Sequence, residues 1–260
     1  MKGVIVSNKR LNDRYGLMTI HCPEFIANVK AGQFFLIQTQ LFDFIYDPLL
    51  RRPFGVCDVD AVDGNFTFLY MIIGKGTKSL AETSSGITIT FSEPLGNGFT
   101  IVKGANVGLV AGGVGIAPLL LLSKTLRDNG NTLDLFYGGG NVEDIVLLDE
   151  FRKSVDRVHI TTDDGTSGER GMIDLPLKRK INELDKIYSC GPKGMLRSIS
   201  EIAMSHAISS EVSLDEYMAC GIGACLGCVV PVSVNGKACQ KRCCSDGPVF
   251  DSATLLWKTV

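Results

Sequence analysis

Short apolar segments interrupted by turn residues dominate the first hundred positions of the chain. These segments occupy residues 2–7, 16–21, 32–39, 53–59, 66–73 and 86–92. Gly, Pro, Asn and Asp separate them, and strands bounded in this way are typical of an antiparallel barrel or sandwich. Residues 93–99 are again rich in turn formers and close the region. The pattern therefore predicts an antiparallel β-domain over residues 1–101.

The pattern changes at Asn106, where continuous apolar runs begin to alternate with helical periods. A buried strand and a glycine turn lead into a helix that ends at Asn129-Gly130, and a second buried strand follows. We expect a helix over residues 143–153, strands from residues 158 and 186, and a helix over 195–206. Strands that alternate with helices indicate an open parallel α/β sheet. The fold expected is multi-domain β plus α/β, with units at 1–101, 102–209 and a cysteine-rich segment at 210–260.

Composition is that of an ordinary globular protein, with 260 residues and a net charge of -2. This length suits two compact domains and a small appendage. The chain has no cluster of basic residues of the kind that binds nucleic acid or an anionic membrane. The longest apolar run, residues 115–122, is far shorter than a bilayer span, so we expect a cytoplasmic protein. The 3 histidines lie near no serine, carboxylate or cysteine at catalytic spacing, and hydrolytic chemistry has no support.

Cysteines provide the sharpest chemical signal, because most of the 9 cysteines fall between Cys220 and Cys244. In a cytosolic protein such clustering indicates metal or redox chemistry rather than disulfides. Cys220, Cys225 and Cys228 have the C-x4-C-x2-C spacing of a plant-type [2Fe-2S] cluster, which needs a distant fourth thiolate. A structural zinc site, in a non-catalytic interaction protein, and inert buried cysteines are the alternatives.

Two segments of the β-region have features of phosphate sites. Arg51 and Arg52 precede a proline, and a guanidinium held in this way can clamp a pyrophosphate. A solvated arginine pair at a surface edge is the alternative. Gly74 and Gly76 stand near a predicted helix start, where free backbone N–H groups can bind phosphate.

Two segments of the α/β region are expected at one edge of the sheet. Residues 111–118, A-G-G-V-G-I-A-P, follow a buried strand, although they lack the third glycine of the dinucleotide fingerprint. Cys190 ends a later strand and is expected beside the same crevice; a small core residue is the alternative. Glu143 and Asp144 follow the second strand, and no arginine occurs before Arg152. An arginine at that place would bind the ribose 2′-phosphate of NADP, so its lack favours NAD over NADP.

These motifs, in this order, resemble those of the ferredoxin reductase superfamily of flavoprotein reductases. The tail Y217-M-A-C-G-I-G-A-C-L-G-C, with C244-S-D-G-P-V-F, resembles the electron-transfer subunits of dihydroorotate dehydrogenase B. The resemblance implies an FAD-binding β-barrel, a nicotinamide-binding α/β domain and a [2Fe-2S] segment.

Site residues follow from the resemblance, position by position. FAD would be bound by Arg52, Pro53, Phe54, Gly55, Met71, Ile72, Ile73, Gly74, Gly76 and Thr77. The nicotinamide would be framed by Gly112, Gly113, Gly115, Cys190, Gly191 and Pro192. The cluster would be held by Cys220, Cys225, Cys228 and Cys244, the last because it precedes S-D-G-P-V-F, with Cys243 held in reserve. The family usually has serine or threonine where this chain has Gly55.

The function implied is electron transfer between NAD(H), FAD and the cluster. The implied partner is the FMN-containing subunit that oxidises dihydroorotate to orotate in pyrimidine biosynthesis, in a heterotetramer of two plus two. The alternative is an NAD(P)H-dependent reductase that serves another partner, such as a hydrogenase or a sulfur-reducing complex.

Overall fold

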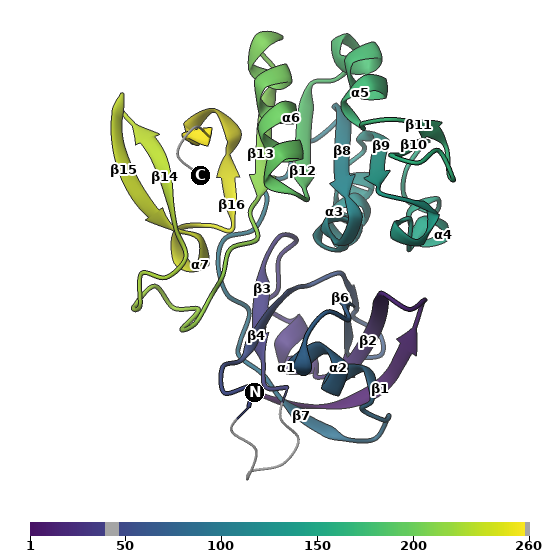
Figure 1. Cartoon of the computed structure of the whole chain (residues 1–260), viewed down its shortest axis with the longest axis vertical. Helices are drawn as coiled ribbons and strands as arrows, with labels where there is room; N and C mark the ends of the chain where they lie inside the picture. Colours follow the sequence, from purple (N-terminus) through teal and green to yellow (C-terminus); the bar gives the residue numbers. More distant parts are fainter. Residues whose placement is uncertain (40–46, 258–260) are drawn as a thin grey trace.

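A computed structural model describes residues 1–39 and 47–257. The N-terminal β-region lies at one end of the molecule and an α/β region at the other. The C-terminal segment lies beside the α/β region, and its loops reach toward the barrel (Figure 1). A single apolar core runs from Ile5 and Phe35 in the β-region to Leu109 and Leu135 in the α/β region. The two regions are therefore packed against each other through buried side chains.

Two antiparallel sheets form the N-terminal region, which we call the barrel. Its elements are β1 (Lys2–Arg10), β2 (Tyr15–His21), α1 (Pro23–Ile26), β3 (Phe34–Ile37), β4 (Arg52–Gly55), β5 (Asp58–Asp60), β6 (Asn65–Met71), α2 (Lys75–Ala81) and β7 (Thr88–Thr90). One sheet has the order β5-β6-β2-β1-β7, and β3 pairs with β4 in the other. Isolated bridges from Phe34 to Leu95 and from Ile37 to Phe91 connect the second sheet to the chain after β7. The predicted antiparallel β-region is confirmed.

Aromatic side chains fill the barrel. Phe25 stacks on Phe66 with ring centroids 4.2 Å apart, and Phe35 meets Phe66 and Phe91 edge to face. All four rings are fully buried. The alternation of apolar and polar residues in the sequence reflects this arrangement, because every second side chain of a strand points into the core.

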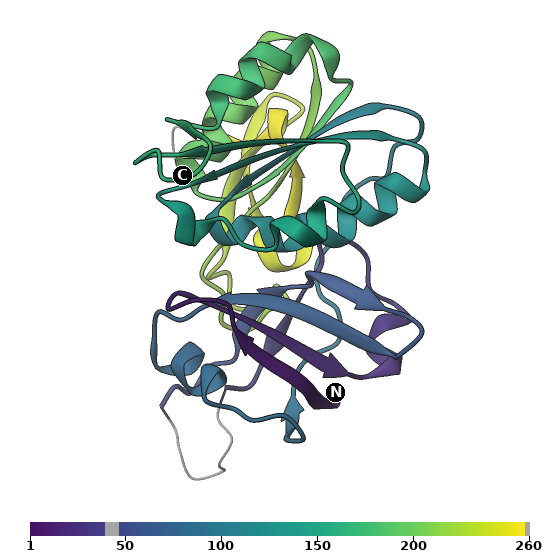
Figure 2. The same cartoon turned by 90° about the vertical axis from the view of Figure 1, so that its right-hand side faces the viewer.

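A parallel sheet with the order β11-β10-β9-β8-β12-β13-β16 forms the second region. Its strands are β8 (Asn106–Gly112), β9 (Thr132–Gly139), β10 (Arg157–Thr162), β11 (Glu169–Arg170), β12 (Lys186–Cys190), β13 (Ser209–Ser213) and the antiparallel β16 (Val249–Asp251). The helices are α3 (Ala117–Asp128), α4 (Leu148–Phe151), α5 (Asp174–Lys180) and α6 (Lys193–Ser205). Figure 2 shows helices on both faces of the sheet, with α3 between the sheet and the barrel. The predicted open parallel α/β sheet is confirmed.

The strand order reverses between β8 and β12. The chain adds β9 and β10 on one side of β8 and then returns to place β12 on the other side. In open α/β sheets, ligands bind outside the carboxyl ends of the strands at such a switch point. Gly112 ends β8 and Cys190 ends β12, so both predicted nicotinamide segments lie at this position.

The helix predicted over residues 143–153 is wrong in its extent. A short 3₁₀ turn occupies Val142–Asp144, and α4 covers only Leu148–Phe151. Leu147 between them has a φ of 60°. This left-handed residue breaks the helix and lets the side chains of Val146 and Leu147 enter the core. The apolar run has the composition of a helix, but burial determines its conformation.

The C-terminal segment contributes a hairpin, a short helix and the last strand of the sheet. Its elements are β14 (Val229–Val234), β15 (Lys237–Arg242) and α7 (Cys243–Asp246), followed by β16. In the described residues, no helix is long and apolar enough to cross a membrane.

Candidate functional site

The cysteines predicted to bind the cluster lie in the loop before β14 and at the start of α7. The backbone N–H of Cys225 donates to Sγ of Cys220 at 3.4 Å, and the N–H of Cys244 donates to Sγ of Cys228 at 3.4 Å. The side chains of Cys220 and Cys225 are also hydrogen-bonded to each other, as are those of Cys228 and Cys244, so the four thiols form two pairs. Within the described ranges, no three His, Cys, Asp or Glu side chains surround one point in metal-binding geometry. Two pairs are the donor set that a cluster of two irons and four thiolates requires.

Backbone N–H groups of the loop point at these sulfur atoms. Gly223 donates to Sγ of Cys244 at 3.1 Å, and Gly227 donates to Sγ of Cys225 at 3.4 Å. Hydrogen bonds from the backbone of Ile222 and Cys225 lower the pKa of the Cys220 thiol to about 6. Gly221 and Gly223 have positive φ values of 70° and 81°, which glycine adopts without strain. The loop therefore favours the thiolate of Cys220, and the thiolate is the metal-binding form of cysteine.

Adjacent Cys243 and Cys244 point in different directions. The thiol of Cys243 donates to the carbonyl oxygen of Leu214 at 3.4 Å, and its burial raises its pKa. The thiol of Cys244 faces Gly223 and Cys228 instead. Burial raises the pKa of Cys244 to about 11, and the neighbouring Cys228 adds to this. A bound metal would offset this cost, since metal binding couples to thiol deprotonation.

The segment after β6 forms a turn that Thr77 closes. Its hydroxyl oxygen accepts hydrogen bonds from the N–H groups of Ile73 and Gly74, at 3.0 Å and 3.1 Å. A Cβ atom at Gly76 would lie 3.0 Å from Oγ1 of Thr39. That hydroxyl is buried and has no hydrogen-bond partner among the described residues. The turn thus presents a narrow polar cradle at the start of α2, which suits a phosphate group.

The strand β4 carries Arg52, Pro53, Phe54 and Gly55, which are also predicted to bind FAD. The guanidinium of Arg52 donates to the carbonyl oxygen of Leu50. Phe54 is half-buried and packs on Phe68, with centroids 5.0 Å apart. At the end of β6, Met71 and the following Ile72 are half-buried, whereas Ile73 is 75% exposed. These half-buried apolar groups form a surface that a flat aromatic ring system could cover.

The two glycine segments of the parallel sheet are in direct backbone contact. A Cβ atom at Gly115 would lie 2.3 Å from the carbonyl oxygen of Cys190. A Cβ at Gly112 would lie 2.6 Å from Cδ of Pro192, and one at Gly191 would lie 2.9 Å from the backbone N of Gly112. Glycine is therefore required at these positions by contact between the two loops.

Cys190 is a buried thiol at the end of β12. Burial raises its pKa to about 12, with a further contribution from Asp215. The side chain therefore stays a neutral thiol. The burial of Cys190 agrees with the alternative interpretation that it is a small core residue. The position of Cys190 at the switch point agrees with the prediction that it lies beside the nicotinamide.

The three predicted sites are neighbours in space. A Cβ at Gly55 would lie 3.8 Å from Pro118, at the start of α3, so the flavin segment faces the glycine turn of the sheet. On the other side, Gly221 of the cysteine loop packs on Leu36 in β3. Leu36 is paired in register with Pro53 of the predicted FAD segment. The FAD segment thus lies between the nicotinamide segment and the cysteine loop.

The sequence interpretation missed a connection between the barrel and the sheet. The sequence predicts Asp144 in a turn near the cofactor ribose, but its side chain is only 8% exposed and contacts the barrel. Arg14 lies 2.6 Å from Oδ1 of Asp144, and the hydroxyl of Tyr15 donates to the same oxygen at 2.9 Å. Asp144 is therefore not free to bind a ribose. Arg14 and Tyr15 stand in no motif, and no sequence signal identifies them.

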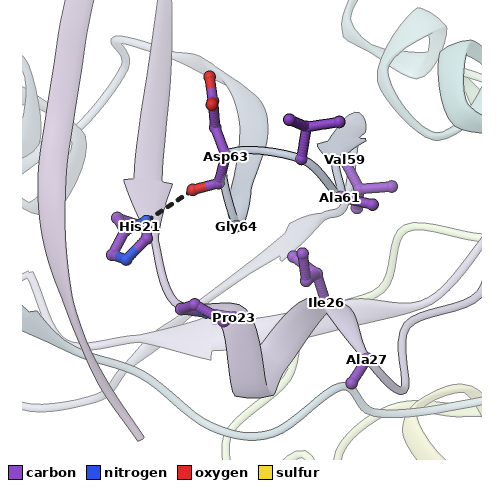
Figure 3. A pocket seen from close by; sticks show the side chains of 9 residues that line it. His21, Pro23, Ile26, Ala27, Val59, Ala61, Asp63 and Gly64 are labelled. Carbon is purple, nitrogen blue, oxygen red and sulfur yellow. Dashed lines mark hydrogen bonds between the residues drawn. The ribbon is translucent and has the colours of Figure 1, made fainter.

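A hollow of about 460 Å³ lies on the barrel away from these sites (Figure 3). It is lined by the end of β2, by α1 and by the turn between β5 and β6, and Nδ1 of His21 is hydrogen-bonded there to the carbonyl oxygen of Asp63. None of the residues predicted to bind a cofactor lines it. The hollow has few polar groups and is not part of the candidate site.

Comparisons with family models match two parts of the chain. Residues 109–201 match the oxidoreductase NAD-binding domain. Residues 215–256 match the iron-sulfur cluster binding domain of dihydroorotate dehydrogenase B.

Solved structures give the same architecture. The structure of an NADH-dependent reduced ferredoxin-NADP oxidoreductase has a TM-score of 0.86 and 30% identity, covering 99% of this chain and 90% of that chain. A ferredoxin NADP+ reductase from Neisseria gonorrhoeae with bound FAD and NADP has a TM-score of 0.65 and 19% identity, covering 79% of this chain and 90% of its own. At 19% identity, this second likeness concerns the fold alone.

Relatives of known name match almost the entire chain. The electron transfer subunit of dihydroorotate dehydrogenase B (NAD(+)) from Caldanaerobacter subterraneus subsp. tengcongensis is 37% identical over 257 residues, which cover 99% of this chain and 98% of the relative. The subunit of the same name from Clostridium perfringens is 37% identical over 254 residues, covering 96% and 95%. Together with the matched iron-sulfur domain and the paired cysteines, these similarities mean that the chain belongs to the family of dihydroorotate dehydrogenase B electron transfer subunits.

Proposed function

We propose that this chain is the electron-transfer subunit of a dihydroorotate dehydrogenase B complex, with FAD, a [2Fe-2S] cluster and NAD(H) as its cofactors. The observation that carries the proposal is the pairing of four thiols within the region that matches the family's iron-sulfur domain. The proposal divides the chain into an FAD-binding unit (1–101), an NAD-binding unit (102–209) and a cluster segment (210–260), which β13 and β16 join to the parallel sheet.

The cluster ligands in this proposal are Cys220, Cys225, Cys228 and Cys244. The N–H groups that point at these sulfurs would stabilise the negative charge of a cluster. Cys243 is left out because its thiol is directed at the carbonyl oxygen of Leu214.

The FAD site in this proposal combines β4 with the turn before α2. Arg52 and Pro53 would hold the pyrophosphate. Gly76 and Thr77 would offer backbone N–H groups at the start of α2, while Gly74 and the Thr77 hydroxyl shape the turn through their mutual hydrogen bonds. The unpartnered hydroxyl of Thr39 beside Gly76 supports a polar ligand there. Phe54, Gly55 and the residues 71–73 would cover the flavin and its ribityl chain.

The nicotinamide site in this proposal is the contact between the two glycine loops. Gly112, Gly113 and Gly115 on one loop and Cys190, Gly191 and Pro192 on the other would frame the ring. The chain has no arginine between the end of β9 and Arg152, which supports NAD rather than NADP.

The chemistry that bound FAD would supply is acceptance of a hydride (one proton with two electrons) from NADH and exchange of single electrons with the cluster. The chain contributes orientation and electrostatics. Its glycine loops, which lie beside Gly55 through Pro118, would orient the nicotinamide, and the neutral thiol of Cys190 would add no charge there. The packing of Gly221 on Leu36 keeps the cysteine loop beside the flavin segment. The proposed partner is the FMN-containing subunit that oxidises dihydroorotate to orotate, in an assembly of two plus two.

Anaerobic absorbance spectroscopy with NADH titration tests this function. We expect a brown protein with one FAD, two irons and acid-labile sulfide per chain, bleached by NADH. Addition of the FMN subunit should then couple NADH oxidation to orotate reduction, or the reverse reaction. Bleaching without coupling would point to a reductase that serves another partner, and a colourless zinc protein would overturn the proposal.

A further inference from the structure

Asp144 connects the barrel to the parallel sheet from a buried position. Its Oδ1 atom lies 2.6 Å from the guanidinium of Arg14 and accepts a hydrogen bond from the Tyr15 hydroxyl at 2.9 Å. Beside it, the side-chain amide of Asn12 donates to the carbonyl oxygen of Glu143 at 2.8 Å. The turn between β1 and β2 is thereby attached to the segment that leads to α4 (Figure 1).

On the barrel side, this connection leads directly to the proposed flavin segment. The N–H of Ile72 donates to the carbonyl oxygen of Arg14 at 2.8 Å. Tyr15 is paired in register with Met71 in the antiparallel sheet. Any shift of Arg14 and Tyr15 would therefore move the residues proposed to cover the flavin.

On the sheet side, Asp144 holds both glycine turns at the carboxyl edge. Its Oδ2 atom accepts a hydrogen bond from the N–H of Gly140 at 2.9 Å, and its carbonyl oxygen lies 2.6 Å from the Tyr137 hydroxyl. The same hydroxyl lies 3.2 Å from the carbonyl oxygen of Gly113, where φ is 51°. Asp144 thus reaches the turn after β9 directly and the turn after β8 through Tyr137.

We propose that Asp144 is a positioning residue that sets the distance between the flavin segment of the barrel and the nicotinamide loops of the sheet. The inference rests on the proposed function, because it concerns the hydride step between the two cofactors. Such a step needs reacting atoms about 3–3.5 Å apart, and a misplacement of about 1 Å can cost about a hundredfold in rate. A buried carboxylate with a guanidinium, a hydroxyl and an N–H as partners is a rigid connection of the kind required.

A second ion pair between barrel and sheet serves as the matched control. Lys124 in α3 lies 2.6 Å from Asp58 in β5. This ion pair also joins the barrel to the α/β region. Asp58, however, contacts α3 and neither of the two glycine turns. Asp58→Asn should therefore cost stability without altering the hydride step.

The kinetic test is stopped-flow reduction of the holoprotein by NADH without oxygen, for wild type, Asp144→Asn and Asp58→Asn. For Asp144→Asn we expect the limiting rate of flavin bleaching to fall about tenfold or more, with the apparent Kd for NADH changed by less than about threefold. FAD content should stay at the wild-type level. A limiting rate equal to that of Asp58→Asn would overturn the inference. A wild-type protein that NADH does not bleach would instead contradict the proposed function.

Hydrogen exchange measured by mass spectrometry gives a readout that does not depend on activity. Asp144→Asn should speed exchange in peptides that cover residues 110–116 and 136–146, whereas Asp58→Asn should not. Tyr15→Phe removes a single hydroxyl and should have the same effect to a smaller degree, so it replaces Asp144→Asn if that variant does not fold. Unchanged exchange in both peptides for both variants would refute the connection.

Discussion

Gly115 lies against the backbone of Cys190, so closely that a Cβ atom would stand 2.3 Å from the Cys190 carbonyl oxygen. The two residues are far apart in the sequence but meet at the point where the strand order of the parallel sheet reverses. This contact joins the two segments proposed to frame the nicotinamide.

Gly115→Ala should separate the two loops. Because both contacting groups are backbone, the overlap cannot be relieved by a side-chain rotation, and we expect a loss of about 1–3 kcal/mol in the free energy of unfolding. NADH binding should weaken as well. Urea unfolding and NADH titration measure these effects. Gly194→Ala is the control, since no described heavy atom lies within 4 Å of its Cβ position; equal behaviour of the two variants would contradict the prediction.

Cys244→Ser and Cys243→Ser should differ in iron content, although the residues are adjacent. Cys244 shares the site of Cys228, whereas Cys243 donates to the carbonyl oxygen of Leu214, a hydrogen bond that serine can keep. We expect loss of the cluster only in Cys244→Ser. Iron and sulfide analysis after anaerobic purification checks this, and a full cluster in Cys244→Ser would argue against the ligand assignment.

Cys225→Ser should remove the cluster and leave the flavin active. Cys225 is exposed and lies in the loop, whereas the flavin and nicotinamide segments share an apolar core to which the cysteine loop contributes no residue. NADH should therefore still bleach the FAD absorbance of this variant. Loss of FAD together with iron would indicate instead that the cysteine loop supports the fold of the whole chain.

Gly55→Ser should be tolerated. The nearest atoms to a Cβ at this position belong to Pro118 at 3.8 Å and 3.9 Å, which is an ordinary contact distance. We expect the free energy of unfolding to change by less than about 0.5 kcal/mol and FAD content to stay the same. Thermal unfolding and the absorbance ratio of flavin to protein test this. A clear loss of FAD would mean that the flavin itself occupies the space beside Gly55.

Acid should weaken the fold partly through Asp134. Burial raises the pKa of this carboxyl, but hydrogen bonds from Arg157 and His159 outweigh it, so the pKa is lowered overall. The ionised carboxylate therefore stabilises the protein above the unfolded pKa of about 3.9, and the contribution disappears as pH falls through the lower folded pKa.

Urea unfolding of wild type and Asp134→Asn between pH 3 and pH 7 tests this dependence. The variant should be less stable by about 1–3 kcal/mol near pH 7, because a partner of Arg157 is lost. The two stabilities should converge toward pH 3. Parallel curves over the whole range would show that the carboxylate charge is not responsible.

Local pattern alone determined much of this protein. Short apolar segments bounded by turn residues identified the barrel strands, and the later alternation of strands and helices identified the parallel sheet. The spacing of Cys220, Cys225 and Cys228 within one loop indicated a cluster, because loop geometry is set by near neighbours in the chain.

Relationships between distant segments were decided by the tertiary structure. Leu147 ends a predicted helix because the core takes up Val146 and Leu147, and no periodicity reports that. The directions of Cys243 and Cys244 depend on Leu214 and Gly223. Asp144 acquires its partners Arg14 and Tyr15 only when the barrel docks on the sheet. Such contacts join residues that are 21 or more positions apart in the chain, so their energies do not appear in any local segment of the sequence.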